Sequence, residues 1–396
     1  MRYFYTLLLI AGLVLPSLRA QTPITDAERE EFGQFLADCF NEGDMGTLVA
    51  RMDQNAYLDL IVDGLGLSAA ELVGFREGAL KGLATTIEKQ FGNFTAGRFL
   101  RLQDSDRGKR ILIRVLSDDG AVNYFGFIAG KSKKGELVWQ DCFIFLAGET
   151  MGETSRRTVL PLVSQMRKGA LGFLKPKEAE YAQAFPMVHK ASLQMQGGQL
   201  IQAWHTLEPL PEAVKLDRTV IMLRLRIAQG IDEAKYLRVM EEWEKTYPGD
   251  QSLDLISIDS ELLRKNYAGC LRRIAAVNQR VGGDPYLLLL SANVCIESGD
   301  YETARKNARQ VLADEPTLYG AYDTLMSIGL RSKNPKETLA VLDEFGERFP
   351  TVDVDAQIVH GDEAFADFRQ TDEYKAWAEA RKAKAEATEA PAAKSD

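Results

Sequence analysis

Residues 299–316 read GDYETARKNARQVLADEP, and this stretch decides the fold of the second half of the chain. Gly299 can take the positive φ at which many helices stop. Ala304 is small where two helices would cross closely, and Ala308 and Leu312 follow at i+4 and i+8 to make one buried stripe. Pro316 ends the helix. The stretch therefore predicts the turn and the second helix of a helical hairpin.

The same features recur with a period of 34 residues, which is typical of repeat architectures. Tyr267 and Tyr301 are separated by this period, and so are Pro316 and Pro350. Pro248 lies two periods before Pro316. We therefore expect five helical hairpins, over residues 184–216, 217–250, 251–284, 285–318 and 319–352.

Residues 299–316 resemble the second half of a tetratricopeptide repeat. The resemblance extends over residues 184–352 and implies an all-α solenoid whose first helices line a groove for a protein or peptide segment. Tyr236 and Thr338 depart from the pattern, because alanine is usual at these positions. The groove positions that the resemblance implies on the two best-matching units are Leu255, Asp259, Leu262, Tyr286, Leu289, Asn293 and Ile296.

The residues beyond the repeats are expected to close the solenoid. A final capping helix over residues 353–378 would cover the last apolar face with its aromatic side chains, which are Phe365, Phe368, Tyr374 and Trp377. Residues 379–396 are mostly Ala, Lys and Glu, and they predict a flexible, solvated tail.

The first half of the chain, residues 22–170, predicts a separate α+β domain. Capping boxes start helices at Thr25-Asp26-Ala27-Glu28 and at Ser68-Ala69-Ala70-Glu71. Antiparallel strands are expected at about 94–103, 110–117, 121–132 and 136–147, with glycine-containing turns between them. Helices followed by a meander are weakly similar to cystatin-like and NTF2-like layouts, in the order of elements only. Residues 171–183 would form the linker to the repeats.

Residues 1–20 predict a signal peptide, because Arg2 precedes an apolar run that ends at Pro16 and Ala20 offers a small residue before the cut. We therefore expect an exported protein, periplasmic or secreted, without an integral membrane span. The formal net charge of -9 argues against binding to nucleic acid, which requires a cationic surface.

No motif in the sequence predicts catalysis, a cofactor or a metal. The four cysteines, Cys39, Cys142, Cys270 and Cys295, lack zinc-type spacing, and the disulfide state of the last two stays open. None of the three histidines lies in a known catalytic motif. Residues 64–69 match G-x-G-x-x-A, but helix-stop glycines and a capping box account for the same letters.

Two functions remain open from sequence. The first is a non-enzymatic scaffold or adaptor that binds a protein or peptide through the tetratricopeptide-like groove. The alternative is a small-ligand-binding or enzymatic N-terminal domain with accessory repeats. This alternative predicts a pocket with a polar floor around Tyr124, Gln140 and Asp141, the last of which lies on an apolar strand. A filled aromatic core at that place would count against the alternative.

Overall fold

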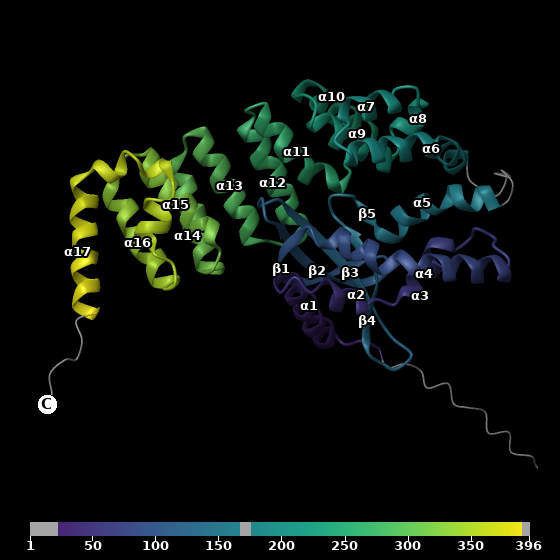
Figure 1. Ribbon diagram of the computed structural model, residues 1–396, viewed down its shortest axis with the longest axis horizontal. Helices are drawn as coiled ribbons and strands as arrows, with labels where there is room; N and C mark the ends of the chain where they lie inside the picture. The colour runs from purple at the N-terminus through teal and green to yellow at the C-terminus, as the bar shows by residue number, and fades with distance from the viewer. Residues whose placement is uncertain (1–22, 167–175, 390–396) are drawn as a thin grey trace, which may run out of the picture. The chain divides into compact units, whose positions relative to one another are not determined.

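The computed structural model describes residues 23–166 and 176–389 and divides them into two compact units (Figure 1). The N-terminal unit comprises residues 23–62 and 67–142, and the C-terminal unit comprises residues 63–66 and those after 142. The predicted signal peptide, the first part of the predicted linker and the end of the predicted tail lie outside the described residues.

Four helices begin the N-terminal unit: α1 (Asp26–Asn41), α2 (Met45–Ala50), α3 (Gln54–Val62) and α4 (Ala69–Phe91). Both predicted capping boxes are present. The hydroxyls of Thr25 and Ser68 accept hydrogen bonds from the backbone N–H groups of Glu28 and Glu71. The carboxylates of these glutamates accept hydrogen bonds from the backbone N–H groups of Thr25 and Ser68. The backbone N–H of Thr25 is the main reason that the pKa of Glu28 is lowered to about 2. Sequence patterning therefore placed both helix starts correctly.

A five-stranded sheet follows, with the strands in consecutive order. Its members are β1 (Phe94–Ser105), β2 (Gly108–Ser117), β3 (Val122–Lys131), β4 (Leu137–Ile144) and the short β5 (Glu149–Thr150). Pairing is antiparallel between β1 and β2 and between β2 and β3. Gly120 and Gly135, in the turns after β2 and β3, take positive φ of 81° and 83°. The helices-then-antiparallel-sheet arrangement expected from sequence is confirmed.

Helix α1 lies very close to the first two strands. A Cβ added to Gly33 would lie 2.5 Å from the ring of Phe99, and one added to Gly97 would lie 2.7 Å from the carbonyl oxygen of Ala37. Only glycine permits this approach. Beside it the helices and the sheet enclose an aromatic core in which neighbouring ring centroids are 5.1–6.3 Å apart. Its members are Phe40, Phe91, Phe125, Phe127 and Trp139.

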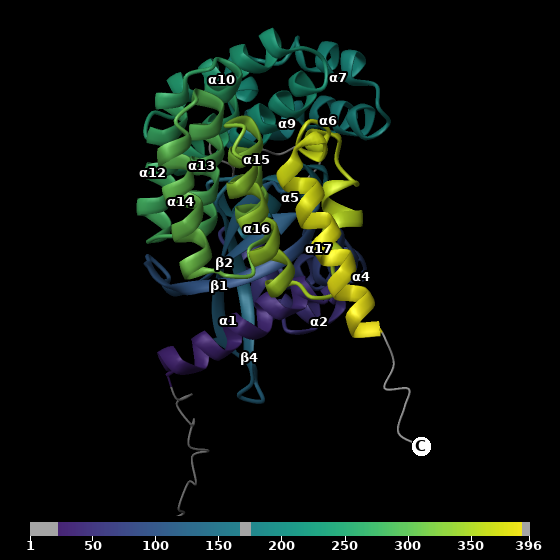
Figure 2. The same cartoon turned by 90° about the vertical axis from the view of Figure 1, so that its left-hand side faces the viewer.

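The C-terminal unit is a long run of helices (Figures 1 and 2). It begins with α5 (Met151–Met166), α6 (Pro176–Gln196), α7 (Leu200–Leu207) and the short α8 (Glu212–Lys215). Four hairpins follow. Their first helices are α9 (Arg218–Gln229), α11 (Gln251–Leu263), α13 (Pro285–Ser298) and α15 (Tyr319–Arg331). Their second helices are α10 (Glu233–Thr246), α12 (Tyr267–Val281), α14 (Tyr301–Asp314) and α16 (Pro335–Arg348).

The hairpins repeat every 34 residues in the structure as in the sequence. Second helices begin at residues 233, 267, 301 and 335, and three of the first helices begin at 251, 285 and 319. Each second helix is preceded by an Asp or Asn whose side chain accepts a hydrogen bond from the backbone N–H three residues ahead. These N-cap residues are Asp232, Asn266, Asp300 and Asn334. Such a cap satisfies a backbone donor that the helix leaves unpaired, which fixes the helix start.

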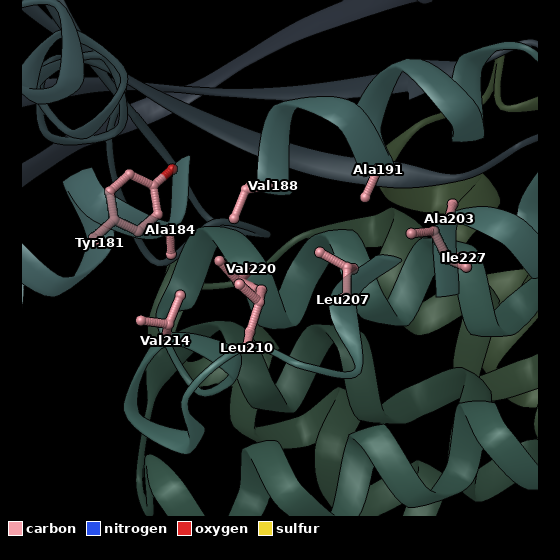
Figure 3. Close-up of a cluster of buried hydrophobic side chains, with 10 residues drawn as sticks. All are labelled: Tyr181, Ala184, Val188, Ala191, Ala203, Leu207, Leu210, Val214, Val220 and Ile227. Atoms are coloured by element: carbon pink, nitrogen blue, oxygen red, sulfur yellow. The ribbon is translucent and has the colours of Figure 1, made fainter. Parts of the chain in front are cut away.

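The hairpins are held together by buried apolar side chains. Figure 3 shows the first of these cores, where Ala191 of α6 and Ala203 of α7 are fully buried beside Ile227 of α9. The position equivalent to Ala304, where a second helix crosses its first helix closely, is buried in all four hairpins. It holds Tyr236, Cys270, Ala304 and Thr338 in turn. The three side chains other than alanine, Tyr236, Cys270 and Thr338, are therefore accommodated inside the core.

Residues 143–150 and helix α5 form part of the C-terminal unit, although the sequence places them in a domain ending at residue 170. Arg218 at the start of α9 donates to the carbonyl of Ala147 at 2.9 Å and forms an ion pair with Asp250. Arg157 of α5 donates to the hydroxyl of Thr219 at 3.0 Å and forms an ion pair with Glu149. These polar contacts tie the segment to the first helical hairpins.

The end of the unit differs from the single capping helix expected over residues 353–378. A π-helical turn (Val354–Val359) and two 3-10 turns (Glu363–Phe365, Phe368–Gln370) precede α17 (Asp372–Glu389). The side chains of Asp353 and Asp362 cap the first two of these segments and break the region into pieces. Phe365, Phe368 and Tyr374 are buried, so the aromatic side chains cover the end as expected. Helix α17 also continues beyond the predicted start of the tail at residue 379.

Candidate functional site

The seven predicted groove residues lie on two successive first helices, α11 and α13. Four of them are packed into the core, with relative exposures between 4% and 8%: Leu255, Tyr286, Leu289 and Ile296. A Cβ added to Gly320 of α15 would lie 3.0 Å from Leu289, so this leucine packs under the next first helix. These four side chains hold the helices together and do not present an open surface.

The other three predicted residues are exposed. Asp259 and Leu262 are one turn apart on α11, and Asn293 occupies the position of Asp259 one repeat later, on α13. The side-chain amide oxygen of Asn293 accepts a hydrogen bond from the hydroxyl of Thr324 on α15, with 2.8 Å between the two oxygens. This hydrogen bond leaves the amide nitrogen directed away from Thr324, as a donor for another group.

Two further exposed residues on α15 were missed from the sequence. Asp323 lies one repeat after the buried Leu289, and Tyr319 lies four residues before Asp323, so both are on one face of the helix. The Tyr319 side chain is 46% exposed. Its ring meets those of Phe345 and Phe349 of the last hairpin, with centroids 4.9 Å and 6.0 Å away. We call Asp259, Leu262, Asn293, Tyr319 and Asp323 the first-helix surface.

The two carboxyl groups of the first-helix surface are exposed yet crowded by protein. Burial raises the pKa of Asp259 above its ordinary value. The pKa of Asp323 is raised by burial and also by the negative charge of Asp362, in the segment after α16. The pKa of Tyr319 is raised by burial and by the negative charge of Asp323. Within the described residues, no ion pair neutralises Asp259 or Asp323.

Several acids elsewhere in the repeats are paired with arginine. Arg273 of α12 contacts Glu244 at 2.8 Å and Asp254 at 3.1 Å, joining two consecutive hairpins. Arg305 of α14 donates to Glu337 of α16 at 2.9 Å and repeats the arrangement further along. Asp259 and Asp323 of the first-helix surface have no such arginine partner among the described residues.

The described residues contain no cluster of three His, Cys, Asp or Glu side chains that could hold a metal. His189 stacks on Phe185, His205 contacts Glu208, and His360 contacts the hydroxyl of Tyr374. All four cysteines are free and buried, including Cys270 and Cys295. No helix in the described ranges is long and apolar enough to cross a membrane.

The alternative site around Tyr124, Gln140 and Asp141 is divided between the two faces of the sheet. Asp141 is 1% exposed and forms an ion pair with Arg107 at 2.5 Å. Its other oxygen accepts the N–H of Cys142 at 2.9 Å. The neighbouring Trp139 belongs to the filled aromatic core, and its indole donates to the carbonyl of Leu48 at 2.8 Å. Each oxygen of the Asp141 carboxylate therefore has a hydrogen-bond partner.

The face of the sheet that carries Tyr124 is more basic than its apolar pattern suggested. Arg114 lies directly opposite Tyr124 on β3 and opposite Arg98 on β1. Arg110 shares this face, where it donates to Gln103 at 2.9 Å, and burial lowers its pKa. The arginines on this face were not identified from the sequence.

Comparison with known protein families gives no match, and comparison with curated proteins finds no similar sequence.

Proposed function

We propose that this chain is an exported, non-enzymatic scaffold that binds a protein or peptide segment on its first-helix surface. The observation that carries the proposal is the presence of exposed polar side chains on three successive first helices, Asp259 on α11, Asn293 on α13 and Asp323 on α15. The packed residues beneath them fix the helices that present these side chains.

The 34-residue hairpins support this function, because stacked repeats present an extended surface to a partner. The resemblance to tetratricopeptide repeats implies the same use of the first helices. Asn293 is suited to a peptide backbone, since an amide side chain can both donate and accept a hydrogen bond. Export to the periplasm or the exterior is part of the proposal and rests on residues 1–20.

The ligand-binding alternative has weaker support. Asp141 already has a cationic partner, and an aromatic core fills the space between the helices and the sheet. A catalytic carboxylate would need a reacting group within hydrogen-bond reach, and these contacts use the carboxylate for structure.

Site-specific photocrosslinking tests the proposal in cells that produce the full chain. A photoreactive residue replaces Asn293, and the matched control carries it at Lys306, which is exposed on second helix α14. We expect a discrete protein adduct from position 293 that is absent from position 306. Adducts of equal yield at both positions, or none at position 293, would refute binding at the first-helix surface.

A further inference from the structure

Two places on the first-helix surface combine an unneutralised carboxylate with an apolar or aromatic side chain. On α15, the ring of Tyr319 and the carboxylate of Asp323 share one face, and Asp362 adds a second negative charge nearby. On α11, the exposed Leu262 follows Asp259 by three residues. The two places lie in the second and fourth of the four hairpins, on either side of the hairpin that carries Asn293.

This combination suits the side chains of arginine and lysine. Their charged ends pair with carboxylates, while their aliphatic stems cover apolar side chains. A guanidinium also stacks favourably on an aromatic ring. The ring of Tyr319 is held by Phe345 and Phe349, so binding would cost little additional side-chain ordering.

Several acids on the hairpins already have an arginine partner, whereas Asp259 and Asp323 are open to an external cation. The second helices join consecutive hairpins through pairs such as Arg273 with Glu244 and Arg305 with Glu337. Asp259 and Asp323 have no such partner among the described residues, although protein atoms crowd both carboxylates. A partially desolvated, unneutralised charge is unfavourable, and a bound cation would remove that cost.

We infer that the segment bound on the first-helix surface is basic, with one arginine or lysine placed against Tyr319 and Asp323 and another against Asp259. The inference rests on the proposed function and adds the chemical class of its partner. An acidic segment would meet like charges at both places and would be rejected.

Fluorescence anisotropy with defined peptides and the purified full chain tests the inference. The probes are a labelled twelve-residue peptide in which arginine alternates with serine and glycine, and a counterpart with glutamate in place of arginine. We expect the arginine peptide to bind and the glutamate peptide not to bind. Binding should weaken strongly with added salt, because the pairs are partly exposed.

Matched variants separate local recognition from the overall negative charge. Asp259→Asn and Asp323→Asn should each weaken binding of the arginine peptide about three- to tenfold. Tyr319→Leu should weaken it about two- to fivefold through loss of the ring. Glu347→Gln changes the net charge equally, at an exposed position on second helix α16, and should alter binding less than about twofold.

Equal binding of both peptides, or equal losses in the three Asp and Glu variants, would overturn the inference. A crosslink at Asn293 to a partner whose binding survives the Asp259→Asn/Asp323→Asn double variant would also overturn it, while leaving the proposed function intact. Failure of the crosslink at Asn293 would instead count against the proposed function. The two experiments therefore fail independently.

Discussion

Gly329 of α15 lies so close to Thr338 of α16 that a Cβ added to the glycine would be 2.4 Å from the threonine hydroxyl oxygen. The two helices of the last hairpin thus cross at a glycine and a buried threonine, where the family resemblance implies alanine on the second helix.

Replacing Gly329 with Ala is expected to lower the free energy of unfolding by about 1–3 kcal/mol, the usual cost of overpacking. Gly74→Ala in α4 is the matched control, because an added Cβ there meets no atom within 4 Å. The control should raise stability by about 1 kcal/mol through helix propensity. Urea denaturation followed by circular dichroism measures both, and a neutral Gly329→Ala variant would contradict the close crossing.

Replacing Asp141 with Asn tests the structural assignment of this carboxylate. The change removes the ion pair with Arg107, and we expect a loss of about 1–3 kcal/mol in the free energy of unfolding. Arg107 is partly exposed, so its remaining charge is solvated and the loss stays moderate. Thermal denaturation provides the measurement. An unchanged midpoint would show that the ion pair contributes little and reopen a functional role.

The ion pair between Arg218 and Asp250 should make stability depend on pH. Burial disfavours ionisation of Asp250, but hydrogen bonds from Arg218 and Ser252 outweigh it and hold the pKa of this carboxyl below its ordinary value. A lowered pKa in the folded state stabilises the fold above the unfolded pKa of about 4. That contribution is lost as the pH falls through the folded pKa.

Arg218→Gln is therefore expected to lower stability at pH 7 and to flatten its decline as the pH falls below the unfolded pKa of about 4. Arg272→Gln, at an exposed position on α12, provides the control. Denaturation midpoints at a series of pH values give the comparison. Parallel pH profiles for the Arg218 variant and the wild type would contradict the assigned role of the ion pair.

The four cysteines should be unreactive in the folded protein and fully reactive after denaturation. All are buried, and burial raises the pKa of Cys39 and of Cys270 to about 11, so little thiolate is present at neutral pH. Titration with a thiol reagent under non-reducing conditions should give four thiols in denaturant. A count of two would indicate a disulfide and contradict the free state of Cys270 and Cys295.

Local signals in the sequence accounted for much of the fold. Capping boxes placed the starts of α1 and α4, and the 34-residue period placed the hairpin helices. The end of the repeat region was harder to predict, because Asp353 and Asp362 cap short turns and divide a segment that has a helical aromatic pattern. Propensity and spacing do not reveal such competition between side-chain caps and a continuing helix.

The candidate site was predicted less well than the fold. The family resemblance placed Asp259 and Asn293 on successive first helices, but it also included four residues that are buried between helices. Exposure depends on the angle at which neighbouring hairpins pack, and that angle is not encoded in a single repeat. Tyr319 and Asp323 were missed because their spacing of four acquires meaning only once α15 presents that face to solvent.

The caps Asn266 and Asp300 begin equivalent helices one period apart, and this equivalence makes the hairpins interchangeable modules. Joining Asn266 directly to Tyr301 would delete one period and still place a capping side chain before the same type of helix. Deleting or adding whole repeats would therefore keep a capping side chain at the start of each second helix. The first-helix surface takes its exposed side chains from three consecutive hairpins, so its extent would follow the number of repeats.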